Sequence, residues 1–208
     1  MLAPLVPRYE GGELLAAILF LGLNSNYGVS LWLPQMVQRL SVFDVSKVSL
    51  IAAIPSLCSL PLMLLVGWHS DRSSERIWHT IVPRLLSAVS LIVCFFSTAS
   101  GNMWLSVAML SLATVGFYCA HPGFWPLPNV FLGQAAAAAS LGLINSFGNL
   151  GGFLGPYMLG ALSDRTGGFG PGLLYLGGCS LASALLVMVV GRDCVFSRKA
   201  QPAATPFQ

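Results

Sequence analysis

The sequence predicts an all-α membrane protein with six transmembrane helices, and three observations support this prediction. Charged residues make up 8% of the 208 residues and apolar ones 55%, whereas a soluble domain usually carries about 25% charged residues. The mean hydropathy is +0.76. The apolar runs are continuous rather than alternating, which favours helices over the strands of a membrane barrel, because backbone in lipid must satisfy its own hydrogen bonds.

Charged residues divide the chain into long uncharged stretches. Four of these lie between Glu13 and Arg39, Lys47 and Asp71, Arg84 and Asp164, and Arg165 and Arg192, and they hold 25, 23, 79 and 26 residues. A helix needs roughly 20 apolar residues to cross a ~30 Å hydrocarbon core, so three stretches hold one span each and the longest holds three. Turn-forming residues divide the longest stretch at 97–102 and 121–134. We expect spans at residues 14–36, 48–68, 80–98, 103–124, 135–162 and 172–191.

Lysine and arginine are unevenly distributed between the two ends of these spans. Six spans place both termini on one side, together with seven of the ten basic residues. These are Arg8, Arg72, Arg76, Arg84, Arg192, Arg198 and Lys199, against Arg39, Lys47 and Arg165. Excess positive charge marks the cytoplasmic side, so we expect a bundle at residues 14–192 in the inner (plasma) membrane, with cytoplasmic segments at 1–13 and 193–208. The net charge of +3 then reflects topology, and no nucleic-acid-binding footprint is visible.

Enzyme, metal and cofactor chemistry find little support in the sequence. The five cysteines show no C-x-x-C pairing, and four of them fall within predicted spans, which is typical of packing residues. An intramembrane serine protease needs a nucleophile in a G-x-S-G context and a facing histidine, but the sequence contains no G-x-S-G. We expect no catalytic residue, no bound metal and no cofactor.

Two polar clusters inside the spans indicate either a cavity or helix packing, because polar groups in hydrocarbon need partners or water. Asn24 and Tyr27 are three residues apart on one face of the first span. Asn145 and Asn149 are four apart on one face of the fifth span. Lining of a central cavity and interhelical hydrogen bonding are the two interpretations of each cluster.

Residues 121–129 combine three prolines with two large aromatic residues. Proline removes a backbone donor and disturbs the preceding turn, so a regular helix should not continue through this stretch. Broken helices at membrane depth are tolerated where they face protein or water. Trp125 then either lines a cavity or anchors the chain at the membrane interface.

Glycines and one arginine complete the features expected within the spans. Gly148 with Gly152, and Gly151 with Gly155, form small-x-x-x-small pairs that let a neighbouring helix approach closely. No aspartate or glutamate lies inside any predicted span. Arg84 lies a few residues into the third span, and we expect its side chain to reach the membrane interface.

One short pattern, G-x-x-S-D-R, occurs at residues 67–72 and again at 160–165, each time closing an apolar run. The repeat suggests two related halves within a membrane bundle and points towards a transporter. Asp71 can accept hydrogen bonds from a neighbouring helix N-terminus or pair with an arginine, and either bond can break when helices move. We expect a gate at Gly67, Asp71, Arg72 and Arg76, with a plain solvated turn as the alternative.

The segment from Gly67 to Arg76 resembles the G-x-x-x-D-R-x-x-x-R loop signature of the major facilitator superfamily. Other segments are similar to the anion:cation symporter family within it, from about Leu14 to Arg192. They are Tyr27-Gly28, Trp32-Leu33-Pro34-Gln35, Phe124-Trp125-Pro126-Leu127-Pro128, Ala135 to Ala139, Leu143-Ile144-Asn145-Ser146 and Gly148-Asn149-Leu150-Gly151-Gly152.

The resemblance implies more than the residues do by themselves. Members of that family have twelve spans in two six-helix halves and carry organic anions such as sugar acids, hydroxy acids or aromatic acids, generally with protons. This chain resembles the carboxyl-terminal half only, which implies two inverted three-helix repeats. By the same resemblance Trp125 and Asn145 line the substrate site, while the proton-coupling acids and anion-pairing arginines belong to the amino-terminal half.

We therefore expect half of a secondary active transporter, embedded in the lipid bilayer, that moves a small organic anion with protons by alternating access. Its partner would be the missing amino-terminal six-helix half or a second copy. The alternative is a truncated or partner-dependent membrane protein that does not transport. The expected substrate contacts are Asn24, Tyr27, Trp125, Asn145 and Asn149.

Overall fold

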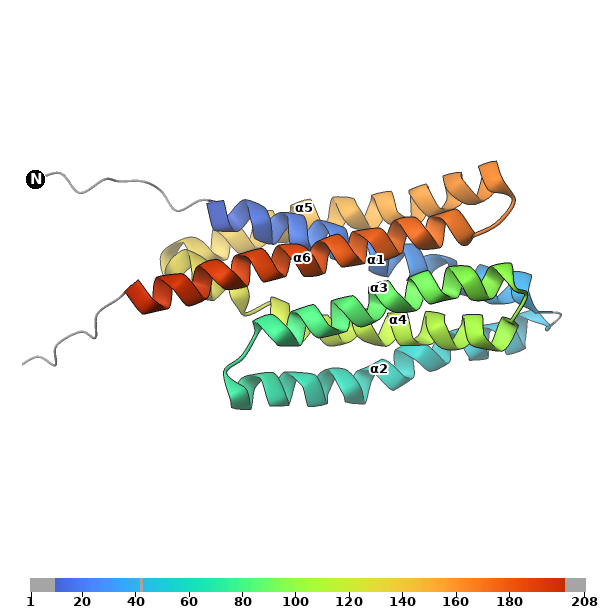
Figure 1. The fold of residues 1–208 in the computed structure, drawn as a ribbon, viewed down its shortest axis with the longest axis horizontal. Helices are drawn as coiled ribbons and strands as arrows, with labels where there is room; N and C mark the ends of the chain where they lie inside the picture. The colour runs from blue at the N-terminus through green and yellow to red at the C-terminus, as the bar shows by residue number, and fades with distance from the viewer. Residues whose placement is uncertain (1–9, 42, 201–208) are drawn as a thin grey trace, which may run out of the picture.

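The computed structural model describes the backbone of residues 10–41 and 43–200 and the side chains of residues 12–41, 43–129 and 140–191. Within these residues the chain forms six α-helices and no strand, which confirms the predicted all-α fold. The helices are α1 (Glu10–Leu40), α2 (Val45–Ser73), α3 (Ile77–Ala99), α4 (Met103–Phe124), α5 (Leu127–Thr166) and α6 (Gly170–Ala200) (Figure 1). The terminal segments expected to be cytoplasmic lie largely outside the described residues.

Five segments of the described chain are long and apolar enough to cross a membrane: Gly12–Leu40, Val45–Ser73, Ile77–Ala99, Met103–Asn129 and Gly170–Gly191. The span expected at 135–162 lies within α5, and the described side chains of that helix from residue 140 onward are not among these five segments. Asn145, Asn149 and several glycines lower the apolar character of this part of α5.

The proline-rich stretch at 121–129 interrupts the helices less than its composition predicts. Pro122 lies inside α4, and the break is confined to Trp125 and Pro126. Pro128 falls in the first turn of α5, where a missing backbone N–H leaves no intrahelical bond unmade. The interruption is therefore limited to two residues, both with helical backbone dihedrals, although three prolines lie in the stretch.

The helices pack in a pattern that relates the first three to the last three. The main packed pairs are α1 with α5, α2 with α4, α3 with α4, α1 with α6, and α3 with α6. Consider an exchange of α1 with α4, of α2 with α5 and of α3 with α6. The α1–α5 pair then becomes α2–α4, the α3–α4 pair becomes α1–α6, and the α3–α6 pair stays the same. Figure 1 shows α2 and α5 on opposite flanks of the bundle. Two inverted three-helix repeats produce this arrangement.

Close backbone contact joins α1 to α5 at two glycines. A Cβ atom added at Gly151 would collide with the backbone carbonyl of Phe20, and one added at Gly155 would collide with that of Asn24. Gly148 meets the side chain of Leu19 in the same way. The glycines spaced four apart therefore serve packing, as their pattern predicts.

Arg84 does not reach the membrane interface, so that expectation is wrong. Its side chain is 1% exposed, and its guanidinium lies against Gly22 of α1, where a Cβ atom would collide with it. Ser180 of α6 donates a hydrogen bond to the Arg84 backbone oxygen at 3.0 Å. Arg84 faces the inside of the bundle, and Gly22 leaves the room that its side chain fills. None of its guanidinium nitrogens has a hydrogen-bond partner within the described part of the chain.

Substitution of Gly155 by leucine should destabilise the bundle by about 1–3 kcal/mol, because the new side chain must push α1 away from α5. Chemical unfolding of the purified chain in detergent, followed by circular dichroism, measures the effect. The matched control is Gly142→Leu, since Gly142 lies on the same helix with nothing within 4 Å of its added Cβ. Equal stability of the two variants would contradict the glycine contact.

Candidate functional site

An exposed face of α1 and α5 carries three of the polar residues that the sequence singled out. Tyr27 is 41% exposed, and its ring lies 2.8 Å from the Cβ position of Gly152 on α5. Asn149, one turn from Gly152, is exposed and donates a hydrogen bond to the Asn145 backbone oxygen at 2.8 Å. The α1–α5 contact therefore places Tyr27 about one helical turn from Asn149 and about two turns from Asn145.

Asn24 points away from this face. It is fully buried, and its Nδ2 donates a hydrogen bond to the hydroxyl of Tyr175 on α6 at 2.9 Å. Its Oδ1 has no partner among the described residues. Asn24 thus makes the interhelical hydrogen bond that was the alternative to lining a cavity, and it joins α1 to α6. Tyr175 was missed because one tyrosine in an apolar run carries no spacing signal.

Trp125 occupies the turn between α4 and α5. It is 36% exposed, and its ring packs edge-on against Phe124 with the centroids 5.6 Å apart. Its backbone N–H bonds to the His121 carbonyl at 3.1 Å. Asn145 lies about five helical turns beyond the start of α5. The structure therefore joins Asn145 to Asn149, and it shows no hydrogen bond from Trp125 to either of them in the described segments.

Polar contacts join the end of α2 to the residues just before α3. Asp71 Oδ1 and Arg76 Nη1 form an ion pair at 2.6 Å. Arg76 also donates to Ser70 Oγ at 3.1 Å, and Ser70 donates in turn to the Glu75 carbonyl at 2.6 Å. The guanidinium of Arg72 lies 5.5 Å from the ring centroid of Trp68. Of the two partners expected for Asp71, the structure shows the arginine.

Both copies of the repeated pattern begin with a glycine that touches a neighbouring helix. A Cβ atom at Gly67 would lie 3.3 Å from Pro122 on α4, and one at Gly160 would lie 2.8 Å from the Trp32 ring on α1. The exchange that relates the two repeats converts the α2–α4 contact into the α5–α1 contact. Glycine is therefore used at the same packing position in each repeat.

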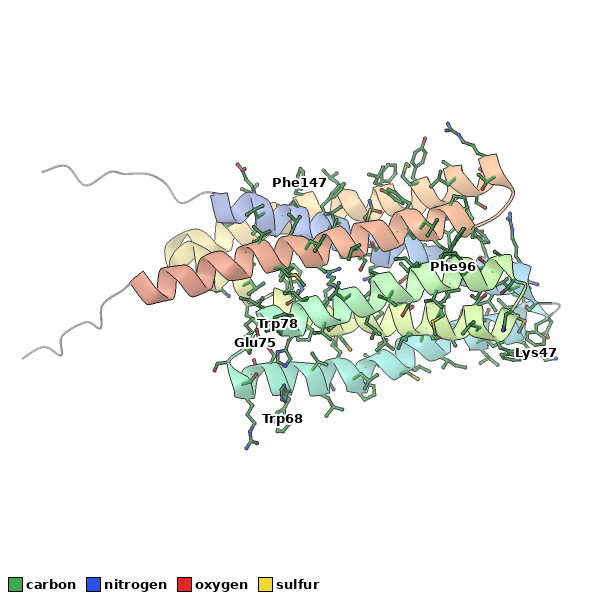
Figure 2. The ribbon with its side chains drawn as sticks, in the orientation of Figure 1. Lys47, Trp68, Glu75, Trp78, Phe96 and Phe147 are labelled. Carbon is green, nitrogen blue, oxygen red and sulfur yellow. The ribbon has the colours of Figure 1, made fainter. Side chains whose placement is uncertain are left out.

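The sequence did not predict a series of hydrogen-bonded side chains that links the end of α2 to the start of α3. Glu75 Oε2 lies 2.7 Å from His79 Nδ1, and His79 Nε2 lies 2.7 Å from His69 Nδ1. Figure 2 shows Trp68, Glu75 and Trp78 at one end of the bundle, opposite Lys47. The spacing of Glu75 and His79, four residues apart at the start of a helix, was the available signal.

Hydrogen bonds hold the Glu75 carboxyl in its ionised form. Its partial burial opposes ionisation, but hydrogen bonds from the Trp78 backbone, the His79 side chain and the His79 backbone outweigh burial and lower the pKa. The backbone N–H groups of Trp78 and His79 donate to it at 2.8 and 3.2 Å. Glu75 thereby satisfies two donors at the start of α3 that have no partner within the helix.

Known proteins resemble this chain in sequence. The profile of the Major Facilitator Superfamily matches residues 3–156. A putative tartrate transporter of Agrobacterium vitis is 36% identical over 177 residues, which are 85% of this chain and 40% of the relative. The putative metabolite transport protein NicT of Pseudomonas putida is 33% identical, with the same shares covered. A quinolone resistance transporter of Acinetobacter baumannii is 31% identical over 90% of this chain and 43% of its own length.

These relatives are transporters by name, which points to a transporter rather than an enzyme. The chain spans about 40% of the length of the first curated relatives it matches. Its six helices and the relation between their packed pairs are those of one half of a twelve-helix fold. The chain is a multi-pass membrane protein that belongs to the major facilitator superfamily.

Proposed function

We propose that this chain is the carboxyl-terminal half of a secondary active transporter of the anion:cation symporter type. It would move a small organic anion together with protons by alternating access. The observation that carries the proposal is the 36% identity to a putative tartrate transporter over 85% of this chain. Tartrate is a small hydroxy acid, which agrees with the substrate class that the sequence resemblance implies.

The exposed apolar surface of α2 and α5 supports a partner half. Both helices carry large apolar side chains that the six-helix body leaves uncovered. On α2 they include Leu50, Leu57 and Leu64, and on α5 they include Leu143, Phe147 and Phe153. The partner would be an amino-terminal six-helix half or a second copy, in the inner membrane with both termini in the cytoplasm. The central cavity would then lie between the two halves.

Within that cavity, the polar face of α1 and α5 would contact the substrate. Asn145 and Asn149 offer amide donors and acceptors, and Tyr27 adds a hydroxyl beside them. Trp125 joins this site on the strength of the sequence resemblance. Asn24 would support this face without contacting the substrate, because its hydrogen bond to Tyr175 holds the α1 backbone that carries Tyr27. The ion-paired loop at Gly67, Asp71, Arg72 and Arg76 would serve as the gate.

Uptake into liposomes tests the division into two halves. Vesicles that contain the purified 208-residue chain alone should accumulate no labelled tartrate, whereas vesicles that also contain its amino-terminal partner should accumulate it under an imposed proton gradient. The partner half alone is the control. Accumulation by the chain alone would contradict the half-transporter proposal, and no accumulation with any partner would favour the non-transporting alternative.

Asn145→Ala and Trp125→Ala should each weaken substrate binding in the assembled transporter. Loss of one hydrogen bond to a charged ligand is worth roughly 1.5–3 kcal/mol, which corresponds to about 10- to 100-fold in affinity. Calorimetric titration of the substrate measures the change, and Ser146→Ala on the neighbouring exposed position is the control. Unchanged affinity in both variants would remove these two residues from the site.

Asp71→Asn should shift the balance between the two access states by a few-fold at most. The Asp71 side chain is 69% exposed, so solvent screens its ion pair, and exposed pairs contribute about 0.2–1 kcal/mol. Alkylation rates of a cysteine introduced at Leu57, in a variant without the native cysteines, report the balance. Asp164→Asn, in the second copy of the pattern, is the control. Identical rates in all forms would reduce the loop to a simple turn.

A further inference from the structure

The chain of Glu75, His79 and His69 links the end of α2 to the start of α3. The Glu75 carboxylate accepts from His79 Nδ1 at 2.7 Å, and the two imidazoles meet through His79 Nε2 and His69 Nδ1 at 2.7 Å. The ring centroids lie 5.0 Å apart. The His79 side chain is 16% exposed, whereas His69 is exposed, so one ring of this contact is held against the fold and the other lies at the surface.

The hydrogen bonds among Glu75, His79 and His69 limit the number of protons that these side chains can bind together. An ionised carboxylate only accepts hydrogen bonds, so His79 Nδ1 carries a proton. Two nitrogens 2.7 Å apart form a hydrogen bond only when a single proton lies between them. The two neutral rings can take up one further proton and keep that bond. A second further proton would place N–H against N–H between two cations, and the contact would break.

The other charged side chains near Glu75, His79 and His69 make contacts of their own. Asp71 pairs with Arg76 in the loop. Arg72 lies over Trp68 on α2.

The helices packed against it add no further described charge at this end. From α4, Pro122 and Gly123 face α2 and α3, and His121 bonds within its own helix to the Phe117 carbonyl. Gly191 of α6 meets Ile77, and the side chains that follow it, including Arg192 and Asp193, lie outside the described part. Among the described side chains, the two imidazoles and Glu75 therefore form a hydrogen-bonded group of their own.

We propose that Glu75, His79 and His69 form a proton-binding site that joins α2 to α3 through one proton shared between the two rings. The site keeps this link when one further proton binds and releases it when a second further proton binds. In the transporter proposed above, this site makes the gate loop sensitive to pH on its side of the membrane. That last consequence rests on the proposed function, whereas proton binding does not.

Nuclear magnetic resonance of the 208-residue chain, labelled with ¹⁵N-histidine in lipid nanodiscs, tests the site without any transport. The chain has three histidines, so each ring can be followed separately. In the wild type, His69 and His79 should titrate in two coupled steps. In His69→Ala, His79 should titrate in a single step, and His121 should keep its wild-type signal as the internal control. Independent single-step titrations of both rings in the wild type would overturn the proposal.

Hydrogen exchange of residues 68–80 gives a second measurement on the same sample. After correction for intrinsic exchange, protection in the wild type should fall roughly 5-fold between about pH 7.5 and 5.5, as expected for the loss of one hydrogen bond. His69→Ala should show the lower protection at both pH values. Protection that is independent of pH in the wild type contradicts the proposal. Either failure leaves the proposed transport function standing, because neither measurement involves the partner half.

Discussion

The backbone contact between α1 and α5 determines where the polar residues of this protein lie. Gly151 and Gly155 allow α5 to touch the α1 carbonyls of Phe20 and Asn24, which no larger residue would permit. Close approach fixes the rotation of the two helices relative to each other. Tyr27 consequently stands beside Gly152, within a turn of Asn149, while Asn24 is turned into the bundle. One steric constraint thus separates the exposed polar face from the buried hydrogen bond to Tyr175.

Both copies of G-x-x-S-D-R use their glycine for helix packing, and the first copy also contributes its aspartate to an ion pair. Gly67 and Gly160 contact equivalent helices, α4 and α1, as the inverted repeats require. The copies diverge after the shared arginine, and the fifth residue after the aspartate is Arg76 in the first copy and Phe169 in the second. Arg76 closes the first loop by pairing with Asp71, whereas Phe169 receives the guanidinium of Arg39 on its ring at 4.8 Å. Architecture is shared, and the ion pair belongs to one repeat.

The number of helices and the glycine packing could be predicted because lipid excludes charge and favours close contact between small residues. The direction of individual side chains could not. Helical spacing places Asn24 and Tyr27 on one face, yet three residues turn a helix by about 300°, and that difference sends one towards α6 and the other towards α5. Arg84 was expected at the interface because only its depth along the chain was known. Its burial depends on Gly22, which is distant in sequence.

In the transporter proposed above, the distribution of titratable groups would divide proton coupling between this half and its partner. No aspartate or glutamate lies in the predicted spans, and the fully buried Arg84 keeps its charge at any physiological pH. The predicted spans therefore offer no carboxylate that could pass a proton across the bilayer. In the site proposed above, Glu75, His79 and His69 would exchange protons where the end of α2 meets the start of α3. In the proposed transporter, this half would sense protons at its gate, and the partner half would have to carry them.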